Sequence, residues 1–351
     1  MVQFLGMLAA ISLTAACWGM YGPVLHVGRE AMHSPLRPFV CVGVSYFVIA
    51  VVVPLLLLAR GEKGAWTTKG VIWSLLAGVA GALGALGVIL ALHFGGKPIY
   101  VMPLVFGGAP VINTLLSAAM NRAFDQLKAL FLAGLLLVIT GAVTVLVFKP
   151  QPAPHPAPVA AAEAGAEAGA AAGAVATPAP APPKSVEKKA EQFVAVLLSI
   201  ALAMASWGSY GPVLHRGQAA MQGSRLRPLV CIGVSYFLIA VLVPLSLLAP
   251  LADPGAWSVN GVLWSLAAGA LGAIGALGTI LAFTLGGKPF TVMPVVFGCA
   301  PVINTLTTLA FNDTPRSAVS PPFLAGMLIV AVGAATVLAF GPRGHAPAKP
   351  A

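Results

Sequence analysis

The sequence predicts an all-α integral membrane protein with ten transmembrane helices, arranged as two inverted repeats of five helices each. Composition is the first observation behind this fold class: the 351-residue chain is 59% hydrophobic and 8% charged, whereas soluble domains carry about 25% charge. The second is a duplication, because 95–114 (GGKPIYVMPLVFGGAPVINT) and 286–305 (GGKPFTVMPVVFGCAPVINT) are identical at 16 of 20 positions. One membrane unit is therefore predicted to be present twice.

Each copy divides into five apolar runs, and about 20 apolar residues are enough for a helix to cross a hydrocarbon core of about 30 Å. No stretch alternates between apolar and polar residues as transmembrane strands do, which leaves helices as the spanning elements. The expected helices are 3–25, 38–59, 70–94, 98–119 and 126–148, then 192–214, 228–249, 261–285, 289–310 and 322–341. We expect the first run to be retained rather than cleaved as a leader, because its counterpart is internal.

A segment of different composition joins the two copies, which occupy 1–149 and 191–342, and a short tail, 343–351, follows them. Most of the joining segment, 150–190, is Ala, Pro and Gly. It has few residues from which to build a core, so we predict a flexible linker. A plain tether and an arm that recruits a partner are both compatible with this composition.

The odd number of helices per copy sets the relative orientation of the copies: the second enters the membrane from the opposite side, so the repeat is inverted. A cytoplasmic N-terminus places eleven Lys and Arg residues inside and four in the short outer loops, or eight when the linker lysines are included. The positive-inside rule favours this arrangement. We expect both termini in the cytoplasm, and the bacterial inner membrane as the location.

The net charge of +10 does not indicate a nucleic-acid partner, since the cations are scattered among short loops rather than gathered in a stripe. In a membrane protein such an excess orients the chain and attracts anionic headgroups, so the lipid bilayer is the expected partner. The four cysteines lack metal-ligand spacing, and no catalytic or cofactor motif is present. We expect no metal, no cofactor and no enzymatic activity, and the composition leaves a homodimer open.

The fourth predicted helix of each copy contains two internal prolines, each of which removes an amide donor and displaces the carbonyl four residues earlier. Such a carbonyl needs another partner in lipid, so we expect these helices to be broken. The helix-breaking residues are Pro103, Pro110, Pro294 and Pro301. Polar residues on the same faces are predicted to contact a solute, and they are Asn113, Thr114, Asn304 and Thr305. Bonding between helices is the alternative role of both asparagines.

Aromatic and hydroxyl side chains form a second set of candidate substrate-binding residues, because such groups line pockets for polar solutes. The set comprises Trp18, Tyr21, Ser45 and Tyr46 in the first copy and Trp207, Tyr210, Ser235 and Tyr236 in the second. Anchoring at the membrane interface is the alternative role of both tryptophans, Tyr21 and Tyr210.

Lys97 and Lys288 occupy matching positions, each between a Gly-Gly pair and a proline that begins a helix. A cation beside the free amides of a helix N-terminus favours anions, and inversion places the two lysines at opposite mouths of the protein. We predict that they attract anions or act as gates, with snorkelling into lipid headgroups as the alternative.

Short motifs repeat near the ends of both copies. Each copy opens with a Trp-Gly pair, and the last helices contain Phe131-Leu132-Ala133-Gly134 with Gly141-Ala142-Val143, and Phe323-Leu324-Ala325-Gly326 with Gly333-Ala334-Ala335. This unit resembles the EamA-type unit of the drug/metabolite transporter superfamily. The resemblance implies ten helices in two inverted repeats, cytoplasmic termini, a central cavity and a small-molecule metabolite as cargo. The chain lacks the acidic residue that often closes the fourth helix in that family, and its linker is longer.

These features predict a secondary transporter, or permease, that works by alternating access between two similar halves. None of the nine acidic residues lies in a predicted span. Intramembrane carboxylates are typical of proton coupling and of sites for organic cations, so the expected cargo is a small neutral or anionic organic metabolite. The alternative is a non-transporting polytopic membrane sensor or assembly partner whose linker recruits another protein.

Overall fold

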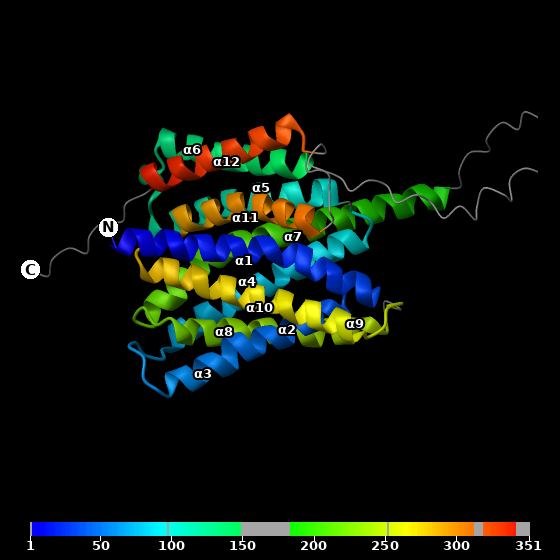
Figure 1. The fold of residues 1–351 in the computed structure, drawn as a ribbon, viewed down its shortest axis with the longest axis horizontal. Helices are drawn as coiled ribbons and strands as arrows, with labels where there is room; N and C mark the ends of the chain where they lie inside the picture. Colours follow the sequence, from blue (N-terminus) through cyan, green and yellow to red (C-terminus); the bar gives the residue numbers. More distant parts are fainter. Residues whose placement is uncertain (1, 97, 149–182, 251–252, 312–318, 342–351) are drawn as a thin grey trace, which may run out of the picture.

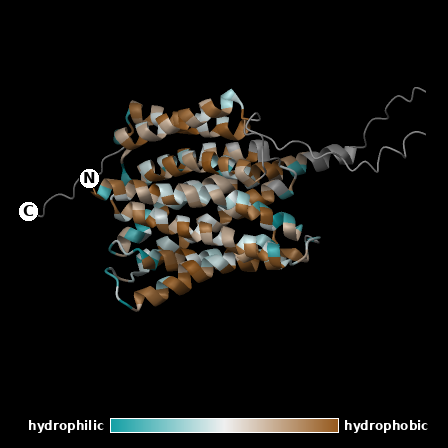
Figure 2. Cartoon of the chain, in the orientation of Figure 1, coloured by the Kyte–Doolittle hydropathy of each residue, from teal (hydrophilic) through white to brown (hydrophobic). Residues whose placement is uncertain are grey.

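The computed structural model describes residues 2–96, 98–148, 183–250, 253–311 and 319–341, and these residues form helices joined by short loops, without strands. Ten helical segments are long and apolar enough to cross a membrane (Figure 1). Apolar residues cover most of their length, and hydrophilic residues gather toward the helix ends (Figure 2). The predicted all-α architecture with ten potential spans is therefore confirmed.

The two halves contain matching series of elements, except that the residues matching η2 lie outside the described part of the second half. The first contains α1 (Val2–Met32), α2 (Arg37–Phe47), η1 (Val48–Val52), α3 (Val53–Leu58), α4 (Thr68–His93), α5 (Pro98–Asn121), η2 (Phe124–Gln126) and α6 (Ala129–Val147). The second contains α7 (Pro183–Ala220), α8 (Leu226–Phe237), η4 (Leu238–Leu242), α9 (Val243–Leu248), α10 (Val259–Thr284), α11 (Pro289–Phe311) and α12 (Pro321–Phe340). Helix α7 starts inside the predicted linker; residues 150–182 and the tail lie outside the described residues.

Helices α1 and α7 continue past the expected ends at residues 25 and 214. Those ends were placed where the apolar runs stop, but backbone hydrogen bonds continue a helix beyond the apolar layer. Both helices pass through an internal proline, Pro23 and Pro212. Their ends are followed by His33 and Gln222, whose φ angles of 48° and 56° lie in the left-handed region that commonly terminates helices.

The second span of each half contains a widened turn. The π-helical segments η1 and η4 lie between α2 and α3 and between α8 and α9. Each precedes a proline, Pro54 or Pro244, whose ring would displace the carbonyl four residues earlier, on Ala50 or Ala240. A wider turn accommodates that displaced carbonyl without ending the helix.

The halves interleave rather than form separate bundles. Helix α1 packs along α10 and α11, and α7 packs along α4 and α5. Glycines permit this approach: a Cβ atom at Gly84 would collide with the ring of Trp207, and one at Gly275 with the ring of Trp18. Small residues at such interfaces let helix backbones approach closely in lipid. The packing of each half thus depends on glycines in the other.

Helices α6 and α12 pack against each other at one side of the bundle (Figure 1). Their contact is also close, since a Cβ atom at Gly141 would lie 2.6 Å from the Val330 amide nitrogen, and one at Gly333 2.6 Å from that of Val138. The ring of Phe131 from α6 and that of Phe323 from α12 are fully buried. This pair closes the side of the bundle next to α5 and α11.

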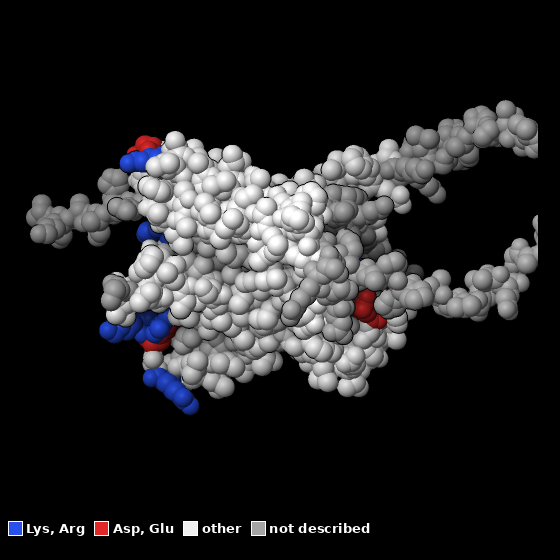
Figure 3. Space-filling model, turned by 45° about the horizontal axis from the view of Figure 1, so that its top comes forward, with Lys and Arg blue, Asp and Glu red and all other residues white. Residues whose placement is uncertain are grey.

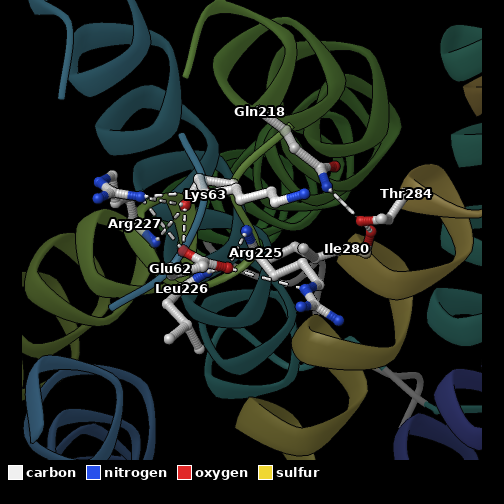
Figure 4. Close-up of polar contacts among 9 residues, drawn as sticks. Glu62, Lys63, Gln218, Arg225, Leu226, Arg227, Ile280 and Thr284 are labelled. Atoms are coloured by element: carbon white, nitrogen blue, oxygen red, sulfur yellow. Dashed lines mark hydrogen bonds and ion pairs between the residues drawn. The ribbon is translucent and has the colours of Figure 1, made fainter. Parts of the chain in front are cut away.

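Two matching polar clusters tie the loops of one half to those of the other, at opposite ends of the molecule. In the first, Asp253 accepts hydrogen bonds from the Ser34 hydroxyl, at 2.6 Å, and from Arg37. In the second, Glu62 accepts from the Ser224 hydroxyl, also at 2.6 Å, and from Arg227, at 3.3 Å (Figure 4). The side chains of Asp253 and Glu62 are 2% and 9% exposed.

Each cluster is completed by a tryptophan. The Arg37 guanidinium lies 5.9 Å from the centroid of Trp257, and that of Arg227 lies 5.9 Å from the centroid of Trp66. The prediction that the acidic residues lie outside the spans is correct for these two carboxylates, whereas Glu30 and Glu191 lie within the potential spans of α1 and α7. The role of Asp253 and Glu62 in joining the halves was not predicted.

We predict that Asp253→Ala destabilises the protein by about 3 kcal/mol, because it leaves the Arg37 guanidinium buried without its counter-charge. The measurement is the thermal unfolding midpoint of purified protein in detergent. Asp125→Ala, which removes an exposed carboxylate from η2, is the control and should leave the midpoint unchanged. Equal midpoints for the two variants would contradict a stabilising role for the cluster.

Candidate functional site

Two stacked tyrosines lie where the halves meet. The rings of Tyr46, from α2, and Tyr236, from α8, are 3.9 Å apart between centroids and almost parallel, at 2°. Both side chains are buried. The Tyr46 hydroxyl donates to the carbonyl oxygen of Gly272 at 2.8 Å, and the half-buried Tyr21 packs against the same hydrophobic core. The structure therefore brings two predicted site residues into direct contact and packs a third against the same core.

Both predicted tryptophans border this stack. The Trp18 indole N–H donates to the Gly272 carbonyl, and that of Trp207 to the Gly81 carbonyl, both at 3.2 Å. The Trp18 ring also meets Tyr210 edge to face, with centroids 5.7 Å apart. We call Trp18, Tyr21, Tyr46, Trp207, Tyr210 and Tyr236 the aromatic core. Its polar groups point among helices, not toward the helix ends.

The two predicted serines lie beside the aromatic core but pack against glycines. A Cβ atom at Gly269 would lie 2.7 Å from that of Ser45, and one at Gly78 would lie 2.8 Å from that of Ser235. Both serines are buried. Their small size suits the close approach of α2 to α10 and of α8 to α4.

The expected breaks in the fourth span of each half are absent. Helix α5 continues through Pro103 and Pro110, and α11 through Pro294 and Pro301. A proline removes only one hydrogen bond from a long helix, and in transmembrane helices neighbouring helices and Ser or Thr side chains satisfy the freed backbone groups. The Thr305 hydroxyl donates to the Pro301 carbonyl at 3.0 Å, so it bonds within its own helix.

The matching asparagines have unequal surroundings. Asn113 is fully buried, and its side-chain amide donates to the Pro289 carbonyl at the start of α11, at 2.9 Å. Asn304 is half-buried beside Gly22 and makes no side-chain hydrogen bond within the described residues. Asn113 thus joins α5 to α11 at one end of the bundle, and Asn304 does not form the corresponding bond at the other.

Other repeat pairs show the same inequality. Tyr210 is buried whereas Tyr21 is half-buried. His215 packs edge to face on Phe283, with centroids 5.3 Å apart, whereas His26 is exposed and pairs with Glu30 at 3.1 Å. We call the end of the bundle that contains Asn113 and His215 the tightly packed end, because these side chains are more buried there than their copies are toward the other end.

Three buried polar atoms near these residues have no partner within the described part of the chain: the Tyr210 hydroxyl, the Asn113 side-chain oxygen and the Thr114 hydroxyl. Buried polar atoms are normally hydrogen-bonded, and an exception requires an explanation. A polar solute next to the aromatic core would supply partners for such atoms.

Lys288 lies at the tightly packed end and lines a hollow of about 210 Å³ with Asn121, His215 and Phe290. A larger hollow, of about 640 Å³, lies at the same end and includes Lys69 and Arg216, but neither hollow reaches the aromatic core. On the face shown in Figure 3, Lys and Arg side chains gather at one end of the molecule. Lys97 lies outside the described residues.

Two interhelical polar residues were not predicted. The Gln218 side-chain amide donates to the Thr284 hydroxyl at 2.8 Å and to the Ile280 carbonyl at 3.1 Å, joining α7 to α10 (Figure 4). Arg216 donates to the Met120 carbonyl of α5. The sequence did contain a signal for these residues, because the two copies differ at both positions. Gln218 is matched by Arg29, and Arg216 by Val27.

Within the described residues, no group of three or more His, Cys, Asp or Glu side chains is arranged to hold a metal ion. The four cysteines are free thiols. The donors near the aromatic core are instead phenol, indole and amide groups, which form hydrogen bonds to neutral or anionic oxygen atoms.

No family model matches the chain, and no curated protein matches it. A solved structure described only as "Crystal structure of protein" is similar over 95% of this chain and 96% of that chain, with a TM-score of 0.60 and 20% sequence identity. At this identity the similarity extends to the fold alone. The arrangement of helices therefore recurs in another protein over almost its whole length.

We predict that Asn113→Leu loosens the tightly packed end, because it removes the hydrogen bond between α5 and α11. Loss of one hydrogen bond, worth about 1 kcal/mol, should increase the equilibrium constant for opening of this end about fivefold. The measurement is the rate at which a water-soluble maleimide labels Phe290→Cys in a variant whose native cysteines are replaced by Ala. Asn304→Leu is the matched control. Equal labelling rates in both backgrounds would contradict the assigned role of Asn113.

Proposed function

We propose that the chain is a secondary transporter that moves a small neutral or anionic organic metabolite across a membrane by alternating access. In this proposal it belongs to the drug/metabolite transporter superfamily, has two inverted EamA-type repeats and places both termini in the cytoplasm. The reciprocal packing of the halves around the aromatic core is the observation on which the proposal rests.

Reciprocal contacts support a two-fold relation between the halves. Trp18 of the first half bonds to Gly272 of the second, and the matching Trp207 bonds to Gly81, at the same distance of 3.2 Å. When a residue of one unit contacts a residue of the other, and the copies of these two residues make the same contact in reverse, a two-fold axis relates the two units. Helix α1 begins at the end of the bundle opposite to that where α7 enters (Figure 1), which supports an axis in the membrane plane.

The unequal ends support alternating access. Two halves of similar sequence and opposite orientation give two conformations of similar energy, in which opposite ends are closed. The described conformation has one end closed by Asn113 and its bond to Pro289. In the opposite conformation Asn304 would take the role of Asn113. With cytoplasmic termini, the end closed by Asn113 faces the cytoplasm.

The chemistry of the aromatic core supports a neutral or anionic cargo. Its phenol and indole groups donate hydrogen bonds. The two carboxylates that the structure buries, Glu62 and Asp253, lie at the ends of the bundle and are paired with arginines. A cationic solute would therefore meet no counter-charge among the described residues of the core.

Transport in proteoliposomes tests the function. Purified protein should take up at least one member of a panel of sugars, amino acids, organic acids and nucleotide-linked sugars, when empty liposomes do not. Folding is monitored in parallel by the thermal unfolding midpoint. Folded protein that moves no member of the panel would overturn the proposal and favour a sensor or assembly partner.

We predict that Tyr210→Phe lowers uptake about tenfold, because its hydroxyl has no partner among the described residues and can therefore bond the solute. A lost hydrogen bond of about 1.4 kcal/mol corresponds to a tenfold change in affinity. Tyr46→Phe is the matched control: its hydroxyl bonds to Gly272, so this change should lower the thermal midpoint. Wild-type uptake by Tyr210→Phe would exclude that hydroxyl from the solute site.

Topology provides a separate prediction. Lys63 and Pro254 occupy matching loop positions and both are exposed. In a background without native cysteines, Lys63→Cys should be labelled only from the cytoplasm and Pro254→Cys only from outside, as assayed with a membrane-impermeant maleimide on cells and on inverted vesicles. Labelling of both from one side would exclude an inverted repeat.

A further inference from the structure

A basic groove lies at the tightly packed end of the molecule, away from the aromatic core. It is the hollow of about 640 Å³ between the start of α4 and the ends of α5 and α7. Its lining residues are Thr67, Lys69, Asn121, His215, Arg216, Ala219 and Ala220. Two of them, Lys69 and Arg216, carry permanent positive charge. Because α4 and α7 belong to different halves, the groove crosses the junction between halves.

Arg216 is held in place without a counter-charge. Its guanidinium donates to the Met120 carbonyl and lies 5.4 Å from the ring centroid of Trp73. Among the described residues, no ion pair includes Arg216 or Lys69, while Glu62 of the same end is already paired with Arg227 and Arg225. The groove therefore offers two positive charges, one of them held in place, that no described acidic side chain neutralises.

The duplication provides an internal comparison. Lys69 of the first copy is matched by Asn260 in the second, and Arg216 of the second copy is matched by Val27 in the first. Trp264, which matches Trp73, packs edge to face on Phe311 with centroids 6.1 Å apart, and no guanidinium of the described residues covers it. The fold therefore does not require a basic groove, since the matching end of the other half has an apolar contact there.

An apolar surface continues from the groove along α4. Ile72 and Leu76 follow Lys69 at spacings of three and four residues, which places all three on one helix face. Both apolar side chains are exposed, at 52% and 47%. In a bilayer this face contacts acyl chains, while Lys69 lies near the level of the headgroups. A positive charge above an apolar helix face complements a phospholipid, whose anionic headgroup lies above its acyl chains.

We propose that the basic groove binds the phosphate headgroup of an acidic phospholipid, with Lys69 and Arg216 contacting the phosphate and the face of Ile72 and Leu76 contacting an acyl chain. Basic pockets between transmembrane helices are suited to anionic headgroups. A lipid bound there contacts both α4 and α7, and so stabilises the closed end. This inference does not depend on which solute is transported.

Thermal unfolding of the full-length protein in detergent tests the proposal. Phosphatidylglycerol should raise the midpoint, because a ligand that binds only the folded state stabilises it, whereas phosphatidylcholine and inorganic phosphate should not. The variant Lys69→Asn/Arg216→Val introduces the residues of the other copy and should weaken phosphatidylglycerol binding roughly 30-fold, from the loss of two charges near the headgroups. Lys63→Asn/Lys128→Asn removes two exposed cations outside the groove and should bind as the wild type does.

Three results would overturn the proposal: equal stabilisation by phosphatidylcholine, equal stabilisation by inorganic phosphate alone, or unchanged phosphatidylglycerol binding by the groove variant. If the double variant fails to fold, Lys69→Asn takes its place, because that exposed side chain makes no ion pair in the described structure. Its expected loss of affinity is about fivefold. Native mass spectrometry of the same samples counts the bound lipids directly.

Discussion

Close contact between helix backbones across the two halves is the constraint on which the rest of the structure depends. Lipid is as apolar as the side chains it surrounds, so helices in a bilayer associate through packing and hydrogen bonds rather than through the hydrophobic effect. Gly84 and Gly275 meet this requirement, since each admits a tryptophan ring from the other half. The indole groups then bond to helix carbonyls, and the tyrosines stack between them. The aromatic core exists because glycine leaves room for it.

Most of the fold was predictable, because the length of an apolar run is enough to define a potential span. The duplication then allowed each predicted helix to be checked against its copy. Predictions of helix ends were weaker. Hydropathy reports where the apolar layer stops, whereas α1 and α7 stop where the backbone turns at His33 and Gln222. The prolines of α5 and α11 show a similar limit: a lost donor is visible in the sequence, but the neighbouring groups that compensate for it are not.

The candidate site was predictable in composition but not in arrangement. The tyrosines and tryptophans were chosen for their chemistry, and their meeting in one core depends on how the halves interleave. The inequality of Asn113 and Asn304 was not predictable, since their sequence surroundings are nearly identical and only the conformation distinguishes them. Candidate residues were chosen mainly because both copies share them, so positions at which the copies differ, such as Arg216 and Gln218, were overlooked.

The two polar clusters at opposite ends limit how the proposed transporter can move. Two rigid bodies joined at two separate points keep one free rotation, about the line that connects those points. That rotation would open both faces of the membrane together and let solute leak through. A carrier with both joints intact must therefore deform within each half, and the widened turns η1 and η4, located between the joints and already lacking regular helical bonding, are the natural places for it to bend.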